Sequence, residues 1–112
     1  MFITFKSNKL RNVFNQKTRL IQEYGKENAR KIIMLRMSVL QAAINLEQIP
    51  KIKPERCHEL KNNRKGTFAV ILKQPYRLIF KPDMKTLPKL DDGGIDLEQV
   101  VSIQILGVED YH

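Results

Sequence analysis

Two histidines are the side chains of this sequence best suited to acid–base chemistry, His58 in the middle of the chain and His112 at its last position. Imidazole gives and takes a proton near neutral pH more readily than any other side chain. Tyr111 stands beside His112, where its side chain could stack on a nucleobase or orient the imidazole ring of His112. A lone histidine is more often a surface or core residue than a catalyst, so this interpretation depends on the residues around the pair.

Basic side chains follow the first histidine in one block that ends in apolar, strand-like runs: Lys61, Arg64, Lys65, Lys73 and Arg77. Such cations bind phosphates in a salt-dependent, sequence-independent way, and they stabilise the charge that grows on a phosphate in a transition state. Together with the histidines, they suit metal-free cleavage of RNA, whose 2′-hydroxyl is an internal nucleophile. The same cations could instead form a solvated surface, with Arg77 paired to Glu109 or Asp110.

Other chemistries have less support in the sequence. Two histidines, one cysteine and scattered carboxylates do not form a metal-ligand spacing, so we expect neither a metal nor another cofactor. Cys57 adjoins His58, but neighbours in an extended segment usually point apart, which disfavours a cysteine nucleophile. The run Asp92-Gly93-Gly94 is a turn signal and not a phosphate-binding loop.

Length and composition predict a single domain over residues 1–112. A hydrophobic content of 42% is too high for a disordered chain. Twenty Lys and Arg against twelve Asp and Glu give a net charge of +8, which favours an anionic partner such as nucleic acid. We see no signal peptide or membrane-spanning run, and a single cysteine fits a reducing compartment, so we expect a cytoplasmic protein that does not bind membranes.

The hydrophobic pattern predicts an N-terminal strand at residues 1–5, then helical segments that begin after a Ser7 cap and stop at Gly25. A longer helix is expected from about residue 26 to 47, because its apolar residues recur every three or four positions. Three strands should follow, at 67–72, 76–80 and 99–106, with a long loop or hairpin tip at 81–98. The fold class is therefore α+β, with the first strand and two helices packed on an antiparallel sheet.

Three stretches carry a family resemblance: MFITFKSNKLRNVF at the start, RCHELKNNRKGTFAVILKQPYRLIF in the middle and EDYH at the end. Together they resemble the HigB, or plasmid maintenance killer, branch of the RelE/ParE toxin superfamily. The most specific parts are H-x-L-K-x-x-R-x-G at 58–66, R-x-x-F at 77–80 and the terminal EDYH. The resemblance implies a RelE-like fold and a ribosome-dependent endonuclease that cuts mRNA in the A site without metal. It also implies two partners, the ribosome and a HigA-like antitoxin.

By position, the resemblance implies a catalytic set of His58, Lys61, Lys73, Arg77, Tyr111 and His112. It implies RNA contacts from Arg64, Lys65, Lys73 and Arg77. The family often has arginine where Lys73 stands, and lysine lacks the bidentate fork that arginine offers a phosphate. Residues 81–98 are longer than the tight hairpin typical of the family. Which histidine is the acid and which the base stays open.

Three alternatives remain from the sequence. The first is a ParE-like poison of DNA gyrase, although the EDYH ending argues against it. The second is a basic module that binds RNA or the ribosome without cutting. The third is an inactive member of the family.

Overall fold

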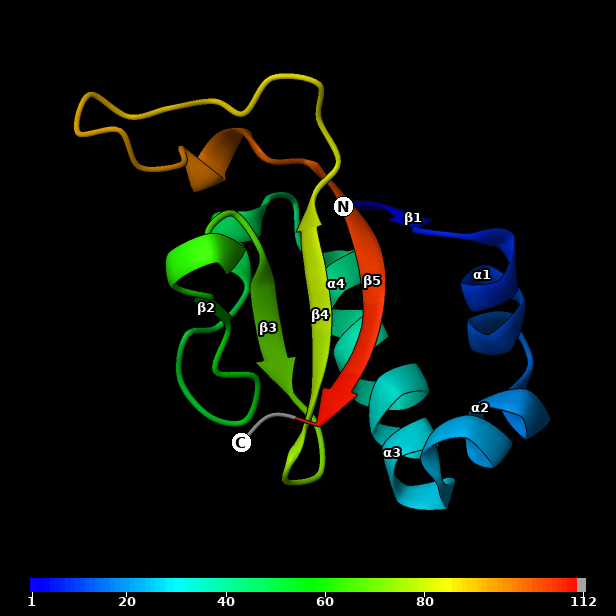
Figure 1. Ribbon diagram of the computed structural model, residues 1–112. Helices are drawn as coiled ribbons and strands as arrows, with labels where there is room; N and C mark the ends of the chain where they lie inside the picture. The colour runs from blue at the N-terminus through cyan, green and yellow to red at the C-terminus, as the bar shows by residue number, and fades with distance from the viewer. Residues whose placement is uncertain (111–112) are drawn as a thin grey trace.

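The computed structural model describes residues 1–110, with the backbone alone at Ile33 and Met34, so the predictions for Tyr111 and His112 lie outside the described residues. Five strands form one sheet in the order β1-β5-β4-β3-β2 (Figure 1). Their bounds are Phe2–Phe5 (β1), His58–Glu59 (β2), Phe68–Ile71 (β3), Tyr76–Pro82 (β4) and Ser102–Asp110 (β5). Neighbouring strands are antiparallel except for β1 and β5, which run parallel. The predicted α+β class is confirmed.

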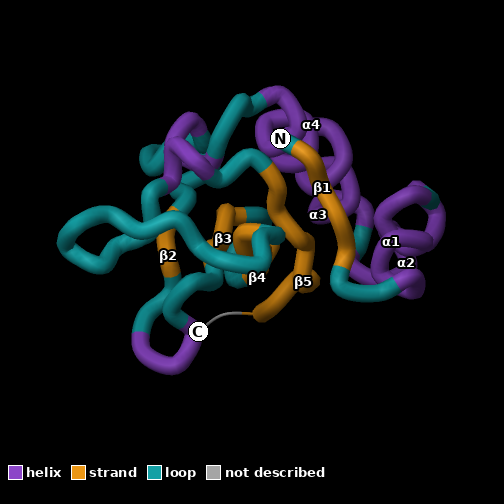
Figure 2. The backbone as a smooth tube through the Cα atoms, turned by 90° about the horizontal axis from the view of Figure 1, so that it is seen from above, coloured by secondary structure: helices purple, strands orange, loops and turns teal. Residues whose placement is uncertain are grey.

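The helical layer comes almost entirely from the first 42 residues. It consists of α1 (Asn8–Asn15), α2 (Lys17–Tyr24), α3 (Lys26–Arg30), a π-helical turn η1 (Lys31–Arg36) and α4 (Met37–Ala42). Three short 3-10 turns complete the structure, η2 (Leu46–Gln48), η3 (Asn62–Arg64) and η4 (Leu97–Gln99). Figure 2 shows α1 to α4 gathered on one side of the molecule, with β2 and the long loop after β4 on the opposite side. Over residues 1–110, no helix is long and apolar enough to cross a membrane.

Local signals at the helix ends agree with the sequence at two points and differ at a third. Ser7 caps α1 by accepting a hydrogen bond from the Leu10 amide at 3.1 Å, and Gly25 ends α2 with φ +86°. The long helix expected to reach residue 47 ends at Ala42. Ala43 is extended, and the Asn45 side chain accepts from the Gln48 amide at 3.2 Å. A short polar side chain that bonds the nearby backbone competes with helix continuation.

One face of the sheet, which we call the covered face, packs against the helices. Its inward residues include Val70, Leu78, Phe80, Ile103 and Ile105, all at most 1% exposed, and they join one cluster with residues of α1 to α4. The rings of Phe68 and Phe80 stack with centroids 6.0 Å apart. Burial of these side chains is the main source of the fold's stability.

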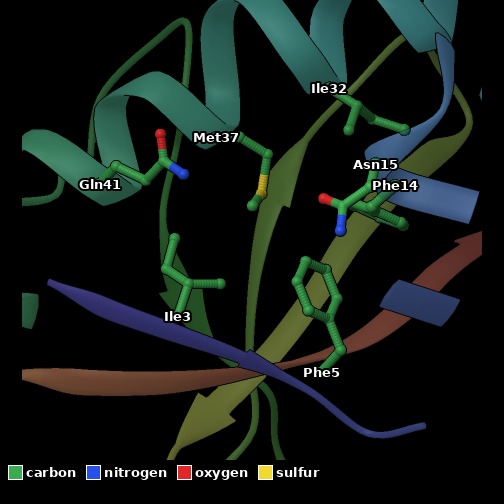
Figure 3. Close-up of a pocket in the computed structure, with 7 residues that line it drawn as sticks. All are labelled: Ile3, Phe5, Phe14, Asn15, Ile32, Met37 and Gln41. Atoms are coloured by element: carbon green, nitrogen blue, oxygen red, sulfur yellow. The ribbon is translucent and has the colours of Figure 1, made fainter. Parts of the chain in front are cut away.

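A cavity of about 230 Å³ remains within this helical side, between β1 and the helices (Figure 3). The cavity is lined by side chains of β1, α1, η1 and α4, namely Ile3, Phe5, Phe14, Asn15, Ile32, Met37 and Gln41. Alternation along β1 therefore sends Ile3 and Phe5 toward the helices, whereas Phe2 is 76% exposed.

The other face, which we call the open face, carries a smaller apolar cluster of Leu60, Ala69 and Ile79 with Leu106 packed against it. A β-bulge in β5 separates the two halves of this strand, because Ile79 pairs with Gly107 and the next residue, Phe80, pairs with Ile105. The extra residue, Leu106, shifts the alternation of everything after it. Glu109 consequently lies opposite Arg77, on the open face.

The segment predicted as a long loop is partly ordered by short-range contacts. β4 extends to Pro82, two residues beyond the predicted strand, and β5 begins at Ser102 and continues to Asp110. Between them, Lys89 and Ile95 form an isolated antiparallel bridge around a turn. The Asp92 carboxylate accepts a hydrogen bond from the Gly94 amide at 2.8 Å within that turn.

Candidate functional site

His58 lies on β2, the edge strand of the sheet, and both of its ring nitrogens have partners. Nδ1 is 2.8 Å from the Arg56 carbonyl oxygen, and Nε2 is 3.2 Å from Nη1 of Arg77. A carbonyl oxygen only accepts hydrogen bonds and a guanidinium nitrogen only donates them. From these partners we assign the ring proton to Nδ1 and the lone pair to Nε2. This is the neutral form of the ring, with the lone pair directed at a cation.

The backbone before His58 explains how its ring is held. Arg56 has a φ of +47°, in the left-handed region that non-glycine residues rarely adopt. The amides on either side of this bend are fixed, because Arg56 donates to the Ile52 carbonyl and Cys57 donates to the Pro50 carbonyl, each at 2.9 Å. The bend places the Arg56 carbonyl within reach of His58 Nδ1. Uncommon backbone conformations of this kind often occur at functional sites.

Arg77 lies in the middle of the open face, on β4. Its Cα partners are Ile71 on β3 and Glu109 on β5. The side chain is half-buried and shares the open face with Ile79, two residues along the strand. The apolar cluster of the open face lowers the local dielectric constant below that of water. A lower dielectric constant strengthens the attraction of the Arg77 guanidinium for an anion.

Arg64 and Glu109 form the second ionic feature of the open face. The two guanidinium Nη atoms donate to the two carboxylate oxygens at 2.7 and 2.6 Å, a bidentate geometry. The pair joins η3 to β5. Glu109 is one of the two carboxylates that the sequence offers to Arg77, and in the structure its carboxylate binds Arg64. The turn that follows η3 is fixed separately, because Glu59 accepts a hydrogen bond from the Gly66 amide at 2.9 Å.

The remaining predicted cations lie at the margin of this group or away from it. Lys61 and Lys65 flank η3 and are exposed. Lys73 is turned toward the helices, with its Nζ 3.0 Å from a carboxylate oxygen of Glu27 on α3. Its backbone amide donates to the Asn28 side chain at 3.0 Å. The hydrogen bond and charge of Lys73 lower the pKa of Glu27.

A cavity of about 380 Å³ adjoins His58 on the side of β2 and is lined by Leu46, Lys51, Cys57, His58, Glu59, Phe68 and Leu97. Burial raises the pKa of the Cys57 thiol to about 12. The thiolate is the reactive form of cysteine, so this residue is inert as a nucleophile at neutral pH. Among residues 1–110, no group of three or more His, Cys, Asp or Glu side chains is arranged to hold a metal ion.

The structure thus brings His58, Arg77 and Arg64 together with Glu109, and it places the Lys73 ammonium with Glu27. Sequence reasoning missed the contribution of Arg56, whose carbonyl orients the imidazole. It also missed Glu109 as the partner of Arg64, because this pairing follows from the β-bulge. The glycine at position 107 was the one available signal, since an isolated glycine in a strand often marks a bulge.

Comparison with known proteins supports the fold. No family model matches the chain, and no curated protein matches it significantly. Among solved structures, a chain of the YoeB–YefM complex from Staphylococcus aureus is similar over 100% of this chain and 97% of that chain, with 20% identity and a TM-score of 0.50. The heterotetrameric YoeB–YefM toxin–antitoxin complex of the same organism gives 19% identity at the same coverage and TM-score. The expected RelE-like architecture is therefore confirmed at the level of the fold.

Proposed function

We propose that this protein is a HigB-like toxin of a type II toxin–antitoxin system, acting in the cytoplasm as a ribosome-dependent mRNA endonuclease. The observation that carries the proposal is the contact between His58 and Arg77 on the open face of a RelE-like sheet. It joins a proton acceptor to a phosphate-binding cation within 3.2 Å, with Arg64 nearby. The similar solved structures are toxin–antitoxin complexes, which supports the same class for this chain.

The geometry favours His58 as the general base. Its Nε2 carries the lone pair and can take the proton of the 2′-hydroxyl while the 2′-oxygen attacks phosphorus. The bond from phosphorus to the 5′-oxygen then breaks, leaving a 2′,3′-cyclic phosphate, and the 5′-oxygen takes a proton from a general acid. We propose His112 for this acid, with Tyr111 stacked on a base or orienting the ring. Neither step needs a metal or other cofactor.

The cations hold the phosphate in this mechanism. Arg77 donates to Nε2 of His58 in the free protein, and an incoming phosphate would draw the guanidinium away and release the lone pair. Lys61, Arg64 and Lys65 are proposed to bind the RNA backbone around it. Lys73 remains a proposed phosphate ligand, and it has to leave Glu27 to take that role.

The distribution of charge supports two anionic partners, ribosomal RNA and an antitoxin. Residues 1–45 contain nine basic and two acidic side chains, whereas residues 46–112 contain eleven and ten. The excess positive charge thus lies in the helical layer, apart from the open face. We propose that this layer contributes to ribosome binding and that a HigA-like antitoxin covers part of the toxin surface.

The decisive experiment is to express the chain alone and with its neighbouring gene, and to map the 5′ ends of cellular mRNA. We expect cuts within translated codons that disappear when translation is stopped or when the antitoxin is present. A translation block with intact messages would contradict the nuclease and support a binding module. Relaxed or broken plasmid DNA with intact messages would support the gyrase alternative.

A further inference from the structure

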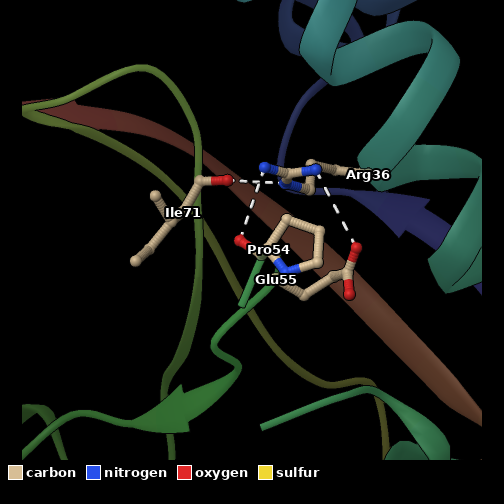
Figure 4. Close-up of polar contacts among 4 residues, drawn as sticks. All are labelled: Arg36, Pro54, Glu55 and Ile71. Atoms are coloured by element: carbon tan, nitrogen blue, oxygen red, sulfur yellow. Dashed lines mark hydrogen bonds and ion pairs between the residues drawn. The ribbon is translucent and has the colours of Figure 1, made fainter. Parts of the chain in front are cut away.

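Arg36 is a charged residue inside the apolar layer between the helices and the sheet. It is the last residue of η1, its side chain is 5% exposed, and it reaches across to β3 and the loop before β2 (Figure 4). Burial of a guanidinium is costly unless its donors are satisfied. The buried position of Arg36 therefore indicates that its guanidinium makes specific structural contacts.

The guanidinium joins two separate segments of the chain. Nε donates to the Ile71 carbonyl on β3 at 2.6 Å, and Nη2 donates to the Pro54 carbonyl at 3.5 Å (Figure 4). Nη1 lies 3.9 Å from a Glu55 carboxylate oxygen, and that carboxylate is also largely buried. The same two segments bond each other directly, because the Ile71 amide donates to the Glu55 carbonyl at 2.9 Å.

Each of these segments is directly connected to one member of the candidate site on the opposite face of the sheet, β3 through its pairing with β4 and the loop through the residues that follow it. Ile71 is the Cα partner of Arg77 in the β3–β4 ladder. Glu55 directly precedes Arg56, whose carbonyl accepts the hydrogen bond from His58 Nδ1. A shift between the two segments would therefore change the distance between His58 Nε2 and Arg77, which is 3.2 Å here.

We propose that Arg36 is a positioning residue that acts through the covered face to hold His58 and Arg77 in register on the open face. Arginine suits this task because its planar guanidinium presents donors in several fixed directions, so that one side chain can bond two carbonyl groups and a carboxylate. Lysine can reach one carbonyl but cannot span both segments. The inference adds a residue to the site of the proposed nuclease and rests on that function only for its kinetic readout.

The test compares Arg36→Met and Arg36→Lys with Glu55→Gln, in the full chain. Long-range ¹⁵N–¹H correlation of the imidazoles at pH 8 reports which nitrogen of His58 carries the proton, and a His112→Gln background leaves His58 as the single histidine. We expect Nδ1–H in the parent and in Glu55→Gln, whose backbone carbonyl is unchanged. In Arg36→Met and Arg36→Lys we expect a mixture of the two tautomers.

Cleavage kinetics on programmed ribosomes supply the second readout. In the chain with His112 intact, Arg36→Met and Arg36→Lys should lower the single-turnover rate at saturating toxin by about tenfold to a hundredfold, because small displacements of catalytic groups are costly. The toxin concentration for half-maximal rate should change much less, since Arg36 does not face the RNA. Glu55→Gln should stay within about threefold of the parent. A parent chain that shows Nδ1–H but cuts no RNA would overturn the proposed nuclease and leave this inference standing.

A double variant separates positioning from stability. Replacing a buried ion pair by apolar residues of similar size is often neutral for stability, so Arg36→Met with Glu55→Leu should fold like the parent. We expect it to lose the single Nδ1–H tautomer despite a similar melting temperature. A folded double variant or Arg36→Lys variant that keeps the parent tautomer and the parent rate would overturn the proposal.

Discussion

The two faces of the sheet are built from the same strands, yet they differ in almost every physical respect. The covered face presents large apolar side chains to the helices, whereas the open face presents His58, Arg77 and Glu109 above a small apolar cluster. Alternation along a strand allows this division, since neighbouring residues point to opposite faces. Within β4, Leu78 and Phe80 contribute to folding while Arg77 contributes to the candidate site.

The comparison also shows where the two faces depend on each other. The β-bulge at Leu106 and Gly107 keeps Ile105 on the covered face and moves Glu109 to the open face. Without the extra residue, strict alternation from Ile105 would send Glu109 toward the helices. One inserted position thus decides whether Arg64 has its bidentate partner.

The largest effect is expected from truncation of the covered face. Phe80 is fully buried and stacks on Phe68, so Phe80→Ala should lower the free energy of unfolding by about 3–5 kcal/mol. Phe2→Ala is the matched control, because Phe2 is 76% exposed, and it should change stability by less than about 0.5 kcal/mol. Urea unfolding followed by circular dichroism measures both. Equal losses for the two variants would refute the division of the sheet into faces.

The next largest effect is expected on the open face, and on activity alone. His58 is exposed and contributes little to the core, so His58→Ala should leave the unfolding midpoint near that of the parent. If His58 is the general base as proposed, its loss should lower A-site cleavage by on the order of a hundredfold or more. Primer extension on programmed ribosomes gives the rate. Full cleavage by a folded His58→Ala chain would remove His58 from the mechanism.

Local sequence signals predicted much of the fold. Apolar runs such as Phe68 to Ile71 fix strands, and Ser7 and Gly25 act through bonds or dihedral angles within their own neighbourhood. The fold class followed because the order of such elements restricts how they can pack. Spacing also predicted that His58 and Arg77 belong to one block, although not that their side chains meet.

What the sequence could not show depends on contacts between distant residues. The end of α4 at Ala42 is set by Asn45 and the turn after it, against a hydrophobic period that continues. The sequence groups Lys73 and Arg77 by charge, but in the structure their side chains contact different partners. Lys73 contacts Glu27, because its backbone amide is anchored on Asn28 of the same helix, whereas Arg77 contacts His58. A buried charge such as Arg36 was visible within an apolar run, whereas its carbonyl partners lie 18 and 35 residues away.

An effect of intermediate size is expected from Cys57, which belongs to the buried cluster of the covered face. Its thiol should make the free energy of unfolding depend on pH. Burial raises its pKa from 9.0 to about 12, so between these values the unfolded chain loses the thiol proton and the folded chain keeps it. The contribution of this group to stability is then full below about pH 9 and is lost as the pH rises toward 12, at a rate of at most about 1.4 kcal/mol per pH unit. Urea unfolding at pH 8, 9 and 10 measures the slope. Cys57→Ala should show a shallower decline, and identical slopes would mean that the thiol is not protected in the folded state.

The smallest expected effect concerns Lys73, whose ammonium binds Glu27 on the helical side of the sheet. The experiment asks whether this ammonium leaves Glu27 to bind a phosphate at the open face. Its ammonium lowers the pKa of Glu27 by a hydrogen bond and by its charge, so Lys73→Ala should raise the Glu27 titration midpoint measured by carboxyl ¹³C NMR. If Lys73 moves to a phosphate, a short RNA added to the parent chain should raise the same midpoint in the same direction. Lys31→Ala is the control, because Lys31 acts on Glu27 through charge alone and is a weaker cause of its shift. RNA could shift the His58 signals and yet leave the Glu27 midpoint unchanged. That result would mean that Lys73 stays bound to Glu27 and that the proposed phosphate site consists of Arg77 and its neighbours.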